Sequence, residues 1–231
     1  MPYPMPVFSS YCLRRTSHVG SHCLECYAFR PQFSSQQIGA LAPRKEDAMT
    51  LIEISAPEFD VDLDIRYAGD DNFTGAPIYT RAACYLNFEA AEKLQKAIEL
   101  AACMDLRFKV FDGFRPTEAV QALWDHTPDP MYLSHPSNGS PHSRGAAIDL
   151  TLIDEQGREL EMGTGFDAMT PLSHHGAVDI SAVVQKNRAI LLGLMSAAGW
   201  DFYQNEWWHY QLFRPRRYPT LSDGAAQTQM M

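Results

Sequence analysis

Residues 140–152 read Ser140-Pro-His-Ser-Arg-Gly-Ala-Ala-Ile-Asp-Leu-Thr-Leu152, a stretch that joins two candidate metal ligands to a strand pattern. Its second half alternates apolar and polar residues, which predicts a half-buried strand with aliphatic side chains on one face and Asp149 on the other. His142 lies seven residues before Asp149, an odd separation that would put the two side chains on opposite faces of an unbroken strand. We therefore expect Gly145 to turn the chain between them.

The segment Glu206-Trp-Trp-His209 supplies a second pair of candidate site residues. Its spacing is also odd, so a bend or bulge near Trp207 is needed to aim both side chains at one point. A hydrolytic zinc site uses three protein ligands and one open position for water, and imidazole and carboxylate groups both serve. His142, Asp149 and His209 match that number. Glu206 lies three residues from a ligand, where it is placed to take the proton of the water.

These residues also have a purely structural interpretation. A buried histidine is more often a hydrogen-bonded core residue than a ligand, and Asp149 alone would serve as a turn or capping group. His174 and His175 are adjacent and cannot easily serve one metal, so we expect them beside the site or in solvent. Spacing alone leaves the metal and the structural interpretations open.

Hydrophobic periodicity outlines a folded region that begins near Met49. Short strands and helices are interspersed in irregular order, with no internal repeat and no glycine-rich phosphate loop. We expect one α+β domain over 49–220, a small antiparallel sheet flanked by helices, followed by a flexible tail over 221–231. The expected strands are 61–67, 106–111, 147–152, 200–203 and 207–212, and the expected helices are 88–103 with Asn87 as N-cap, 117–124, and 182–198 ended by Gly199.

The composition excludes several classes of protein. Acidic residues outnumber basic ones by 28 to 19, and the basic residues are scattered, which argues against a nucleic-acid partner. No apolar run is long enough for a membrane span, and no signal-peptide core is present. An odd number of cysteines, five, argues against a disulfide framework. We expect a cytoplasmic enzyme without a membrane partner, with homo-oligomer formation left open.

Residues 1–48 differ from the rest of the chain. They carry five basic and three acidic side chains and three of the five cysteines, and they lack hydrophobic periodicity. We expect a disordered extension, or translated sequence upstream of a start at Met49. The alternative is a metal site formed by Cys12 with His22-Cys23-x-x-Cys26. A single Cys-x-x-Cys without a matching second pair is weak evidence for such a site.

The motif Ser-x-His-x-x-Gly-x-Ala-x-Asp followed by Glu-x-x-His resembles the signature of the zinc D,D-peptidases with the hedgehog-like α+β fold. Three more segments occur in register and extend the resemblance to the D-alanyl-D-alanine dipeptidases of the VanX type. They are Tyr67-Ala-x-x-Asp-Asn-Phe-Thr-Gly75, Asp112-Gly-Phe-Arg-Pro116 and Met162-Gly-Thr-Gly-Phe-Asp167. The resemblance covers about 65–212 and leaves out 1–48.

The resemblance implies roles for individual residues and a single zinc ion per chain, with no organic cofactor. Asp167 is the position that would meet the ammonium group of a dipeptide, although the stretch from Asp149 to Asp167 is about one residue shorter than is usual for the family. The implied roles are zinc ligand for His142, Asp149 and His209, general acid and base for Glu206, oxyanion contact for Arg115, and pocket lining for Tyr67, Ser140 and Asp167.

The implied reaction is hydrolysis of D-alanyl-D-alanine to two molecules of D-alanine by a zinc-activated water. Two alternatives stay open. Related folds act as D,D- or L,D-carboxypeptidases or endopeptidases on peptidoglycan stem peptides. The Trp207-Trp208 pair, the segment Asp112-Gly-Phe-Arg-Pro116 and Asp167 favour a closed dipeptide pocket over these. The second alternative is a zinc-bearing binding module without hydrolysis, against which Glu206 argues. Glycopeptide resistance and recycling of D-alanine are both compatible with the sequence.

Overall fold

The structure is a computed structural model, and it describes residues 50–231. The expected extension over 1–48 and the alternative site at Cys12, Cys23 and Cys26 lie outside the described residues. Within 50–231, none of the helices combines the length and the apolar character that crossing a membrane requires.

The described residues form a five-stranded sheet, a separate two-stranded sheet and four α-helices. The larger sheet has the order β2-β4-β5-β7-β6, and the smaller one pairs β1 with β3. Every pair is antiparallel except β2 with β4. The strands are β1 (Leu51–Glu53), β2 (Val61–Leu63), β3 (Tyr85–Asn87), β4 (Leu106–Asp112), β5 (Ala147–Asp154), β6 (Asp201–Phe202) and β7 (His209–Gln211); the helices are α1 (Phe88–Ala102), α2 (Thr117–His126), α3 (Ala182–Ala198) and α4 (Asp223–Ala226); and the short 3-10 turns are η1 (Arg66–Ala68), η2 (Pro136–Asn138), η3 (His142–Arg144), η4 (Pro171–Ser173) and η5 (Pro215–Arg217).

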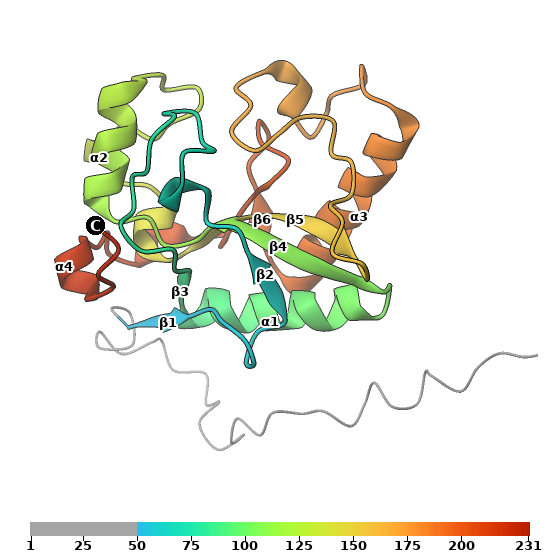
Figure 1. The fold of residues 1–231 in the computed structure, drawn as a ribbon, viewed down its shortest axis with the longest axis horizontal. Helices are drawn as coiled ribbons and strands as arrows, with labels where there is room; N and C mark the ends of the chain where they lie inside the picture. Colours follow the sequence, from blue (N-terminus) through green and yellow to red (C-terminus); the bar gives the residue numbers. More distant parts are fainter. Residues whose placement is uncertain (1–49) are drawn as a thin grey trace, which may run out of the picture. The chain divides into compact units, whose positions relative to one another are not determined.

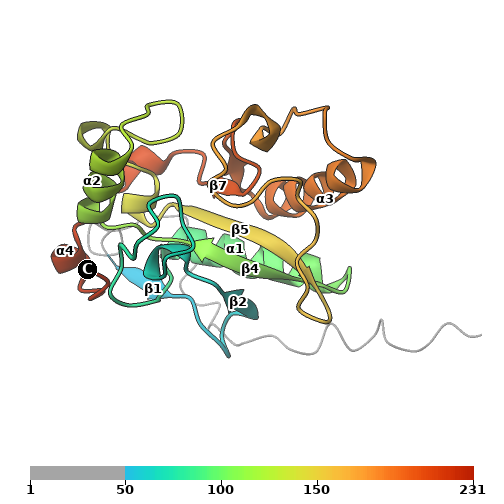
Figure 2. The same cartoon turned by 45° about the horizontal axis from the view of Figure 1, so that its top comes forward.

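The central strand β5 separates the hydrophobic core from the side of the sheet that carries polar groups. Its aliphatic residues Ile148, Leu150 and Leu152 are fully buried in the core, as their alternation predicts. Figures 1 and 2 show α1 running along one side of β4 and β5, while the long connections of the chain rise on the other side. Asp149, between two of the aliphatic residues, therefore points toward these connections.

Asn87 joins the start of α1 to the segment that precedes β5. Its side-chain oxygen accepts a hydrogen bond from the amide of Ala90 at 2.9 Å, the N-cap contact that the sequence predicts. Its own amide donates to the carbonyl of Gly145 at 2.8 Å, and its side-chain nitrogen donates to the carbonyl of Arg144 at 3.2 Å. One capping residue thus starts a helix and holds the chain between His142 and β5.

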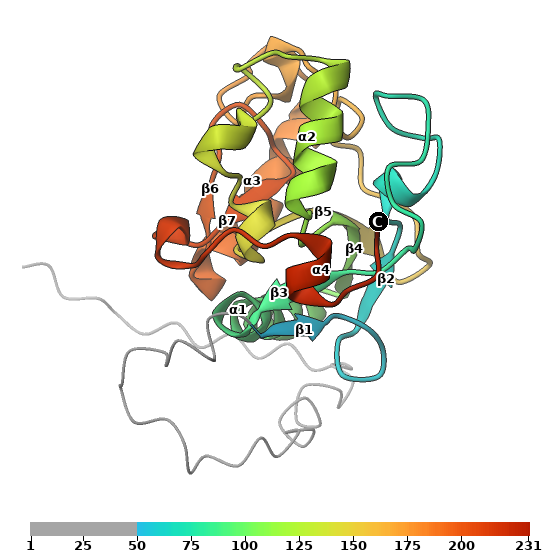
Figure 3. The ribbon, with the colours of Figure 1, turned by 90° about the vertical axis from the view of Figure 1, so that its left-hand side faces the viewer.

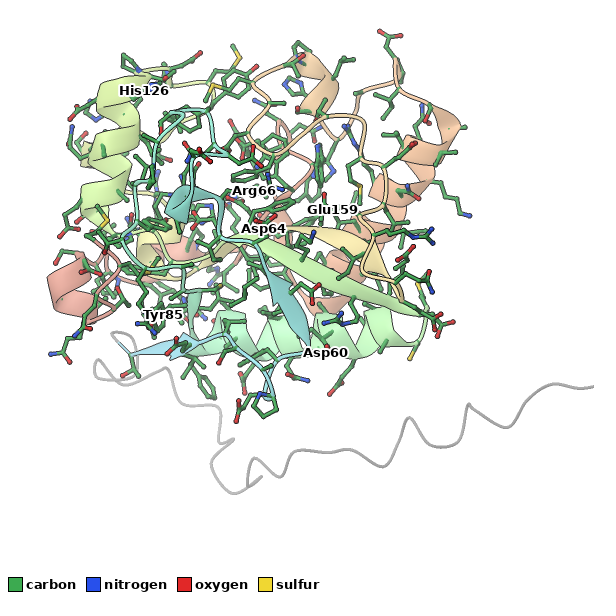
Figure 4. All side chains as sticks on the ribbon, viewed as in Figure 1. Asp60, Asp64, Arg66, Tyr85, His126 and Glu159 are labelled. Atoms are coloured by element: carbon green, nitrogen blue, oxygen red, sulfur yellow. The ribbon has the colours of Figure 1, made fainter. Side chains whose placement is uncertain are left out.

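A cluster of ion pairs holds η1 against the sheet. Arg66 pairs with Asp64 at 2.9 Å and approaches Glu159 to 4.0 Å, and Figure 4 shows these three side chains beside one another near β2 and β4. The guanidinium of Arg66 also lies over the ring of Phe111, 4.9 Å from its centre. The next residue, Tyr67, is thereby placed on the polar side of the sheet.

The expected α+β class is confirmed, with the difference that the larger sheet is mixed rather than purely antiparallel. Helix α3 has the expected bounds, and Gly199 ends it with a φ of 95°. The strand expected over 61–67 is shorter and ends at Leu63, because the chain then turns into η1. β7 begins only at His209, since the residues before it form a turn.

The last eleven residues pack against the domain, where the sequence led us to expect a flexible tail. The amide of Thr117 donates to the carbonyl of Leu221 at 3.1 Å, and that of Thr80 donates to the carbonyl of Met230 at 2.7 Å. Met230 is fully buried. Figure 3 shows α4 and the C-terminus on the side of the domain that carries α2. Met230 and Met231 follow a largely polar segment, so no periodic pattern in the sequence predicts the burial of Met230.

We predict that replacing Gly145 with alanine destabilises the domain more than the same change at Gly157. Both glycines have a positive φ, of 58° and 74°, which costs an alanine about 1–2 kcal/mol. A Cβ at Gly145 would lie 2.7 Å from the amide nitrogen of Asn87, whereas nothing lies within 4 Å of one at Gly157. Overpacking of this kind adds about 1–3 kcal/mol. Urea unfolding of the two variants measures the difference, and equal free energies of unfolding would show that the Gly145 turn can relax.

Candidate metal centre

Three polar side chains lie in one row across adjacent strands. Asp112 of β4 is paired with Asp149 of β5, and Asp149 is paired with His209 of β7. The register of β4 shifts between Val110 and Asp112, so that Asp112, and not Phe111, stands opposite Asp149. Directly opposed residues have Cβ atoms about 4.5–5.5 Å apart. The strand register therefore brings the three groups together.

His142 reaches this row from the turn η3. Gly145 ends that turn in the left-handed region, and the chain then enters β5. This is the reversal that the odd spacing of His142 and Asp149 predicts. The carbonyl of His142 accepts a hydrogen bond from the amide of Arg115 at 3.2 Å, which ties the turn to the segment that follows β4.

His142, Asp149 and His209 form a buried group that could hold a metal ion. Nε2 of His142 is 3.1 Å from Nδ1 of His209, and these two nitrogens are 3.3 and 3.0 Å from the carboxylate oxygens of Asp149. Tetrahedral ligands held about 2.0–2.2 Å from an ion are about 3.3–3.6 Å apart. The three donors therefore have nearly the separation that one shared ion requires.

Hydrogen bonds on the outer side of each ring determine which imidazole nitrogen is free. Nδ1 of His142 is 2.7 Å from the carbonyl oxygen of Gly113, which only accepts, so this nitrogen carries the proton. Nε2 of His209 is 3.2 Å from the side-chain oxygen of Gln211, and its Nδ1 is 3.0 Å from a carboxylate oxygen of Asp149. Protons on the inner nitrogens, Nε2 of His142 and Nδ1 of His209, face the carboxylate of Asp149; a bound cation would replace them and leave both rings neutral, each with an unprotonated nitrogen toward the ion. This set of acceptors fits a cation, and outer hydrogen bonds of this type orient metal-ligating histidines.

Arg115 is fixed between two buried carboxylates. Its Nε is 2.8 Å from Oδ2 of Asp112, and its Nη2 is 3.4 Å from Oδ2 of Asp149. The hydroxyl of Tyr79 donates to the other oxygen of Asp112 at 2.9 Å. Burial raises the pKa of Asp149, but the two neighbouring histidines lower it by more, so this carboxylate stays ionised. The guanidinium is thus a rigid positive charge beside the candidate metal ligands.

Glu206 enters the site from the turn before β7. Its amide donates to the carbonyl of Tyr203, and its own carbonyl accepts from the amide of His209, both at 3.3 Å. The bend expected near Trp207 is therefore a tight turn. A carboxylate oxygen of Glu206 lies 3.9 Å from Nδ1 of His209, close to the metal group but outside hydrogen-bond distance. Burial raises the pKa of Glu206 to about 8.

The two tryptophans of this turn belong to the hydrophobic core. Trp207 and Trp208 are buried, and Nε1 of Trp207 donates to the hydroxyl of Thr164 at 2.8 Å. Neither tryptophan lines the cavity beside the histidines, contrary to the expectation that the pair closes a dipeptide pocket. The turn directs its outer residues, Glu206 and His209, toward the cavity and its middle residues into the core.

A cavity of about 460 Å³ lies over the row of polar groups. On its wall the hydroxyl of Tyr67 donates to the carboxylate of Asp167 at 2.6 Å, and the Arg115 guanidinium lies 4.8 Å from the centre of the Tyr67 ring. Burial raises the pKa of Asp167 to about 7, and the hydrogen bond from Tyr67 opposes this shift. All eight residues selected from the sequence line this cavity: Tyr67, Arg115, Ser140, His142, Asp149, Asp167, Glu206 and His209.

Several residues of the site were missed in the sequence. Asp112 lies three residues before Arg115, and Gln211 lies two residues after His209, on the same face of β7. The period of two of a strand is the signal that could have identified Gln211. Tyr203 and the segment 130–135 also line the cavity, and the Tyr203 hydroxyl donates to the carbonyl of Met131 at 3.2 Å. No local pattern marks these wall residues.

His174 and His175 are not among the three grouped ligands and do not line the cavity. The ring of His175 instead contacts the rings of Phe202 and Tyr210 edge-on. Burial lowers the pKa of His175 to about 4, so it is a neutral packing residue at neutral pH.

Comparison with known proteins gives consistent matches. Residues 47–220 match the model of the peptidase M15 family described as D-ala-D-ala dipeptidase. A D-alanyl-D-alanine dipeptidase of Escherichia coli is 39% identical over 177 residues, which cover 77% of this chain and 92% of the relative. One from Enterococcus faecium is 37% identical, and the match covers 68% of this chain and 87% of the relative. One from Streptomyces coelicolor is 35% identical, and the match covers 64% of this chain and 84% of the relative.

We predict that the tight metal site depends on His142 and Asp149 together. The double variant His142→Ala, Asp149→Ala leaves a single donor of the buried group, so it should be purified without the one metal ion per chain expected for the unaltered protein. His135→Ala is a matched control, because His135 lines the same cavity outside the group. Elemental analysis of the purified proteins gives the stoichiometry. Full metal content in the double variant would show that the ion binds elsewhere.

Proposed function

The chain belongs to the D-ala-D-ala dipeptidase family, and on that premise we propose that it is a zinc-dependent hydrolase that cleaves D-alanyl-D-alanine to two molecules of D-alanine. One observation carries the proposal: the buried His142–Asp149–His209 group shares a single cavity with Glu206, Arg115 and Asp167. The cavity therefore holds a metal site, a proton carrier, a fixed positive charge and a carboxyl group for an amine.

The ligand set favours zinc. Two imidazole nitrogens and one carboxylate oxygen are typical of catalytic zinc sites, which keep a fourth position open. When bound here, zinc would polarise the carbonyl of the scissile bond and lower the pKa of a water toward 7. The task of His142, Asp149 and His209 is to hold the ion, and that of Gly113 and Gln211 is to keep both rings in the required tautomer.

Glu206 is suited to move the proton. It lies near the metal group without contacting it directly, so its carboxylate is free to accept a proton from the attacking water and to return it to the departing amine. A pKa raised by burial favours a group that must both take and give a proton near neutral pH. The turn that holds Glu206 is anchored by the two buried tryptophans, which limits its movement.

Arg115 is suited to stabilise negative charge on the carbonyl oxygen. Asp112 holds its Nε, and the rest of the planar guanidinium remains directed at the cavity and at Asp149. A positive charge fixed before the reaction needs no reorganisation when the oxyanion forms. Asp167, held by Tyr67, is the carboxyl group that would pair with the free amino terminus of the substrate.

The proposed function is tested by comparing substrates. Wild-type protein loaded with zinc should release D-alanine from D-Ala-D-Ala, and far more slowly from N-acetyl-D-Ala-D-Ala or a tripeptide ending in D-Ala-D-Ala. The acetylated dipeptide has no ammonium group to face Asp167, and the tripeptide carries its ammonium group one residue farther from the scissile bond. Liberated D-alanine is measured by an enzyme-coupled assay. Equal rates on the dipeptide and the tripeptide would favour a carboxypeptidase. Binding of the dipeptide without hydrolysis would favour the non-catalytic module.

We predict that Glu206→Ala retains zinc and loses turnover by at least about 10²–10⁴-fold, the usual contribution of general acid–base catalysis. Arg115→Ala should lose about 10²–10³-fold through the missing oxyanion contact. Metal content and kcat are measured on the same samples. A Glu206→Ala protein that hydrolyses D-Ala-D-Ala at the wild-type rate would contradict the mechanism.

The Arg115 comparison requires a second variant. Arg115→Ala leaves the buried carboxylate of Asp112 without its cation, and breaking a buried pair in this way costs about 3–5 kcal/mol of stability. Arg115→Lys retains the charge but loses the planar fork, so it should fold better and recover only part of the rate. A circular dichroism melt of each variant separates loss of folding from loss of catalysis.

A further inference from the structure

Three arginines line the cavity, and they differ in their partners. Arg115 is paired with Asp112 and Asp149. Arg144 and Arg216 line the cavity as well, but within residues 50–231 neither forms an ion pair with a carboxylate. The proposed mechanism uses Arg115 and leaves the other two positive charges without a role.

Arg144 is held in place without being neutralised. It is the last residue of η3, half-buried, and one nitrogen of its guanidinium donates to the backbone carbonyl of Tyr218. A Cβ at Gly139 would lie 2.8 Å from the other terminal nitrogen of Arg144, so the guanidinium occupies the space left by this glycine. Gly139 itself has a φ of 69°, a conformation that favours glycine. The backbone is therefore shaped around a fixed guanidinium.

Arg216 stands on the adjoining part of the same wall. It lies in η5, is exposed, and has no hydrogen bond or ion pair to other described residues. Burial and the nearby charge of Arg216 lower the pKa of Arg144, so the two positive charges repel one another. The segment that carries Arg216 is tied to η3, because the amide of Leu221 donates to the carbonyl of Ser143 at 2.8 Å. Because this hydrogen bond holds the two segments together, they do not move apart to reduce the repulsion between the arginines.

We propose that Arg144 and Arg216 bind the C-terminal carboxylate of the substrate dipeptide. The inference rests on the proposed function and adds a specificity determinant to it. A dipeptide is a zwitterion. Among residues 50–231, the carboxyl group of Asp167 and the guanidinium groups of Arg144 and Arg216 line the cavity without forming an ion pair. An anion between the two arginines removes their repulsion, and a carboxylate matches the fork of a guanidinium.

This arrangement would place the scissile bond between the two charged ends of the substrate, over the metal group. Asp167 would receive the ammonium group, and the two arginines the carboxylate. A peptide amide presents no negative charge to the arginines, so the protein should discriminate against a blocked C-terminus as well as a blocked N-terminus. Both requirements together describe a dipeptidase.

The test uses Arg216→Ala, since this side chain is exposed and forms no hydrogen bond or ion pair with other residues of 50–231. Its KM for D-Ala-D-Ala should rise about tenfold with kcat unchanged, because a hydrogen bond to a charged group contributes about 1.5 kcal/mol or more. The Arg214→Ala variant is the matched control: it removes the same charge two residues away, from a side chain that does not line the cavity. Its KM should equal that of the wild type.

D-Ala-D-Ala amide separates carboxylate binding from a general loss of activity. The wild type should cleave the amide with a KM about tenfold higher than for the free acid, and Arg216→Ala should handle the amide as the wild type does. Arg144→Gln keeps a donor for the carbonyl of Tyr218 and removes the charge, so it should also raise KM for the acid alone. Arg216→Lys should recover part of the affinity.

The outcomes distinguish this inference from the proposed function. If the wild type cleaves D-Ala-D-Ala but Arg216→Ala leaves KM unchanged, or raises KM equally for acid and amide, the arginine pair does not bind the carboxylate and the dipeptidase function stands. An effect of Arg214→Ala as large as that of Arg216→Ala would reduce the role to general surface charge and overturn the proposal. A wild type that fails to hydrolyse D-Ala-D-Ala would overturn both.

Discussion

The carboxylate of Asp149 is an ionised group at the centre of a buried sheet, and the surrounding structure is arranged to compensate it. An ionised carboxylate removed from water costs several kcal/mol unless charges and donors surround it. Here the compensation comes from His142, His209 and Arg115, which belong to a turn, a strand and a loop that are distant in the sequence. The chain is folded so that these three segments meet at the one strand that carries Asp149.

Two features of the backbone fix the positions of the polar groups around Asp149. The first is the register of β4, β5 and β7, which places Asp112, Asp149 and His209 side by side and uses a bulge in β4 to do so. The second is Asn87, which caps α1 and also holds the backbone beside Gly145. Both the strand register and the hydrogen bonds of Asn87 act on the backbone. The positions of the polar groups therefore depend on secondary structure rather than on flexible surface contacts.

The cavity above this row has an uneven distribution of charge that agrees with the proposed substrate. Glu206 and Asp167 are carboxyl groups whose pKa values burial raises to about 8 and about 7, and neither has an ion-pair partner among arginines of the described residues. Arg144 and Arg216 are guanidinium groups that form no ion pair with a carboxylate of residues 50–231. A small zwitterion would supply a partner of opposite charge to each kind of group, with the proposed reaction between them.

Local patterns in the sequence predict the α+β class, the bounds of α3 and the strand nature of β5. Spacing together with the family resemblance selects eight of the residues that line the cavity. The sequence also indicated that Gly145 and the Glu206–His209 segment must turn. The three-dimensional structure was needed to show that Trp207 and Trp208 belong to the core and that Met230 is buried. It was also needed to show that Asp112 holds Arg115 and that Gln211 contacts the ring of His209. It alone brought Arg144 and Arg216 to the same wall. The reason is physical: a period of two or 3.6 reports which face of an element is apolar, whereas the partner of a polar group depends on strand register and on loops that close over long distances in the chain.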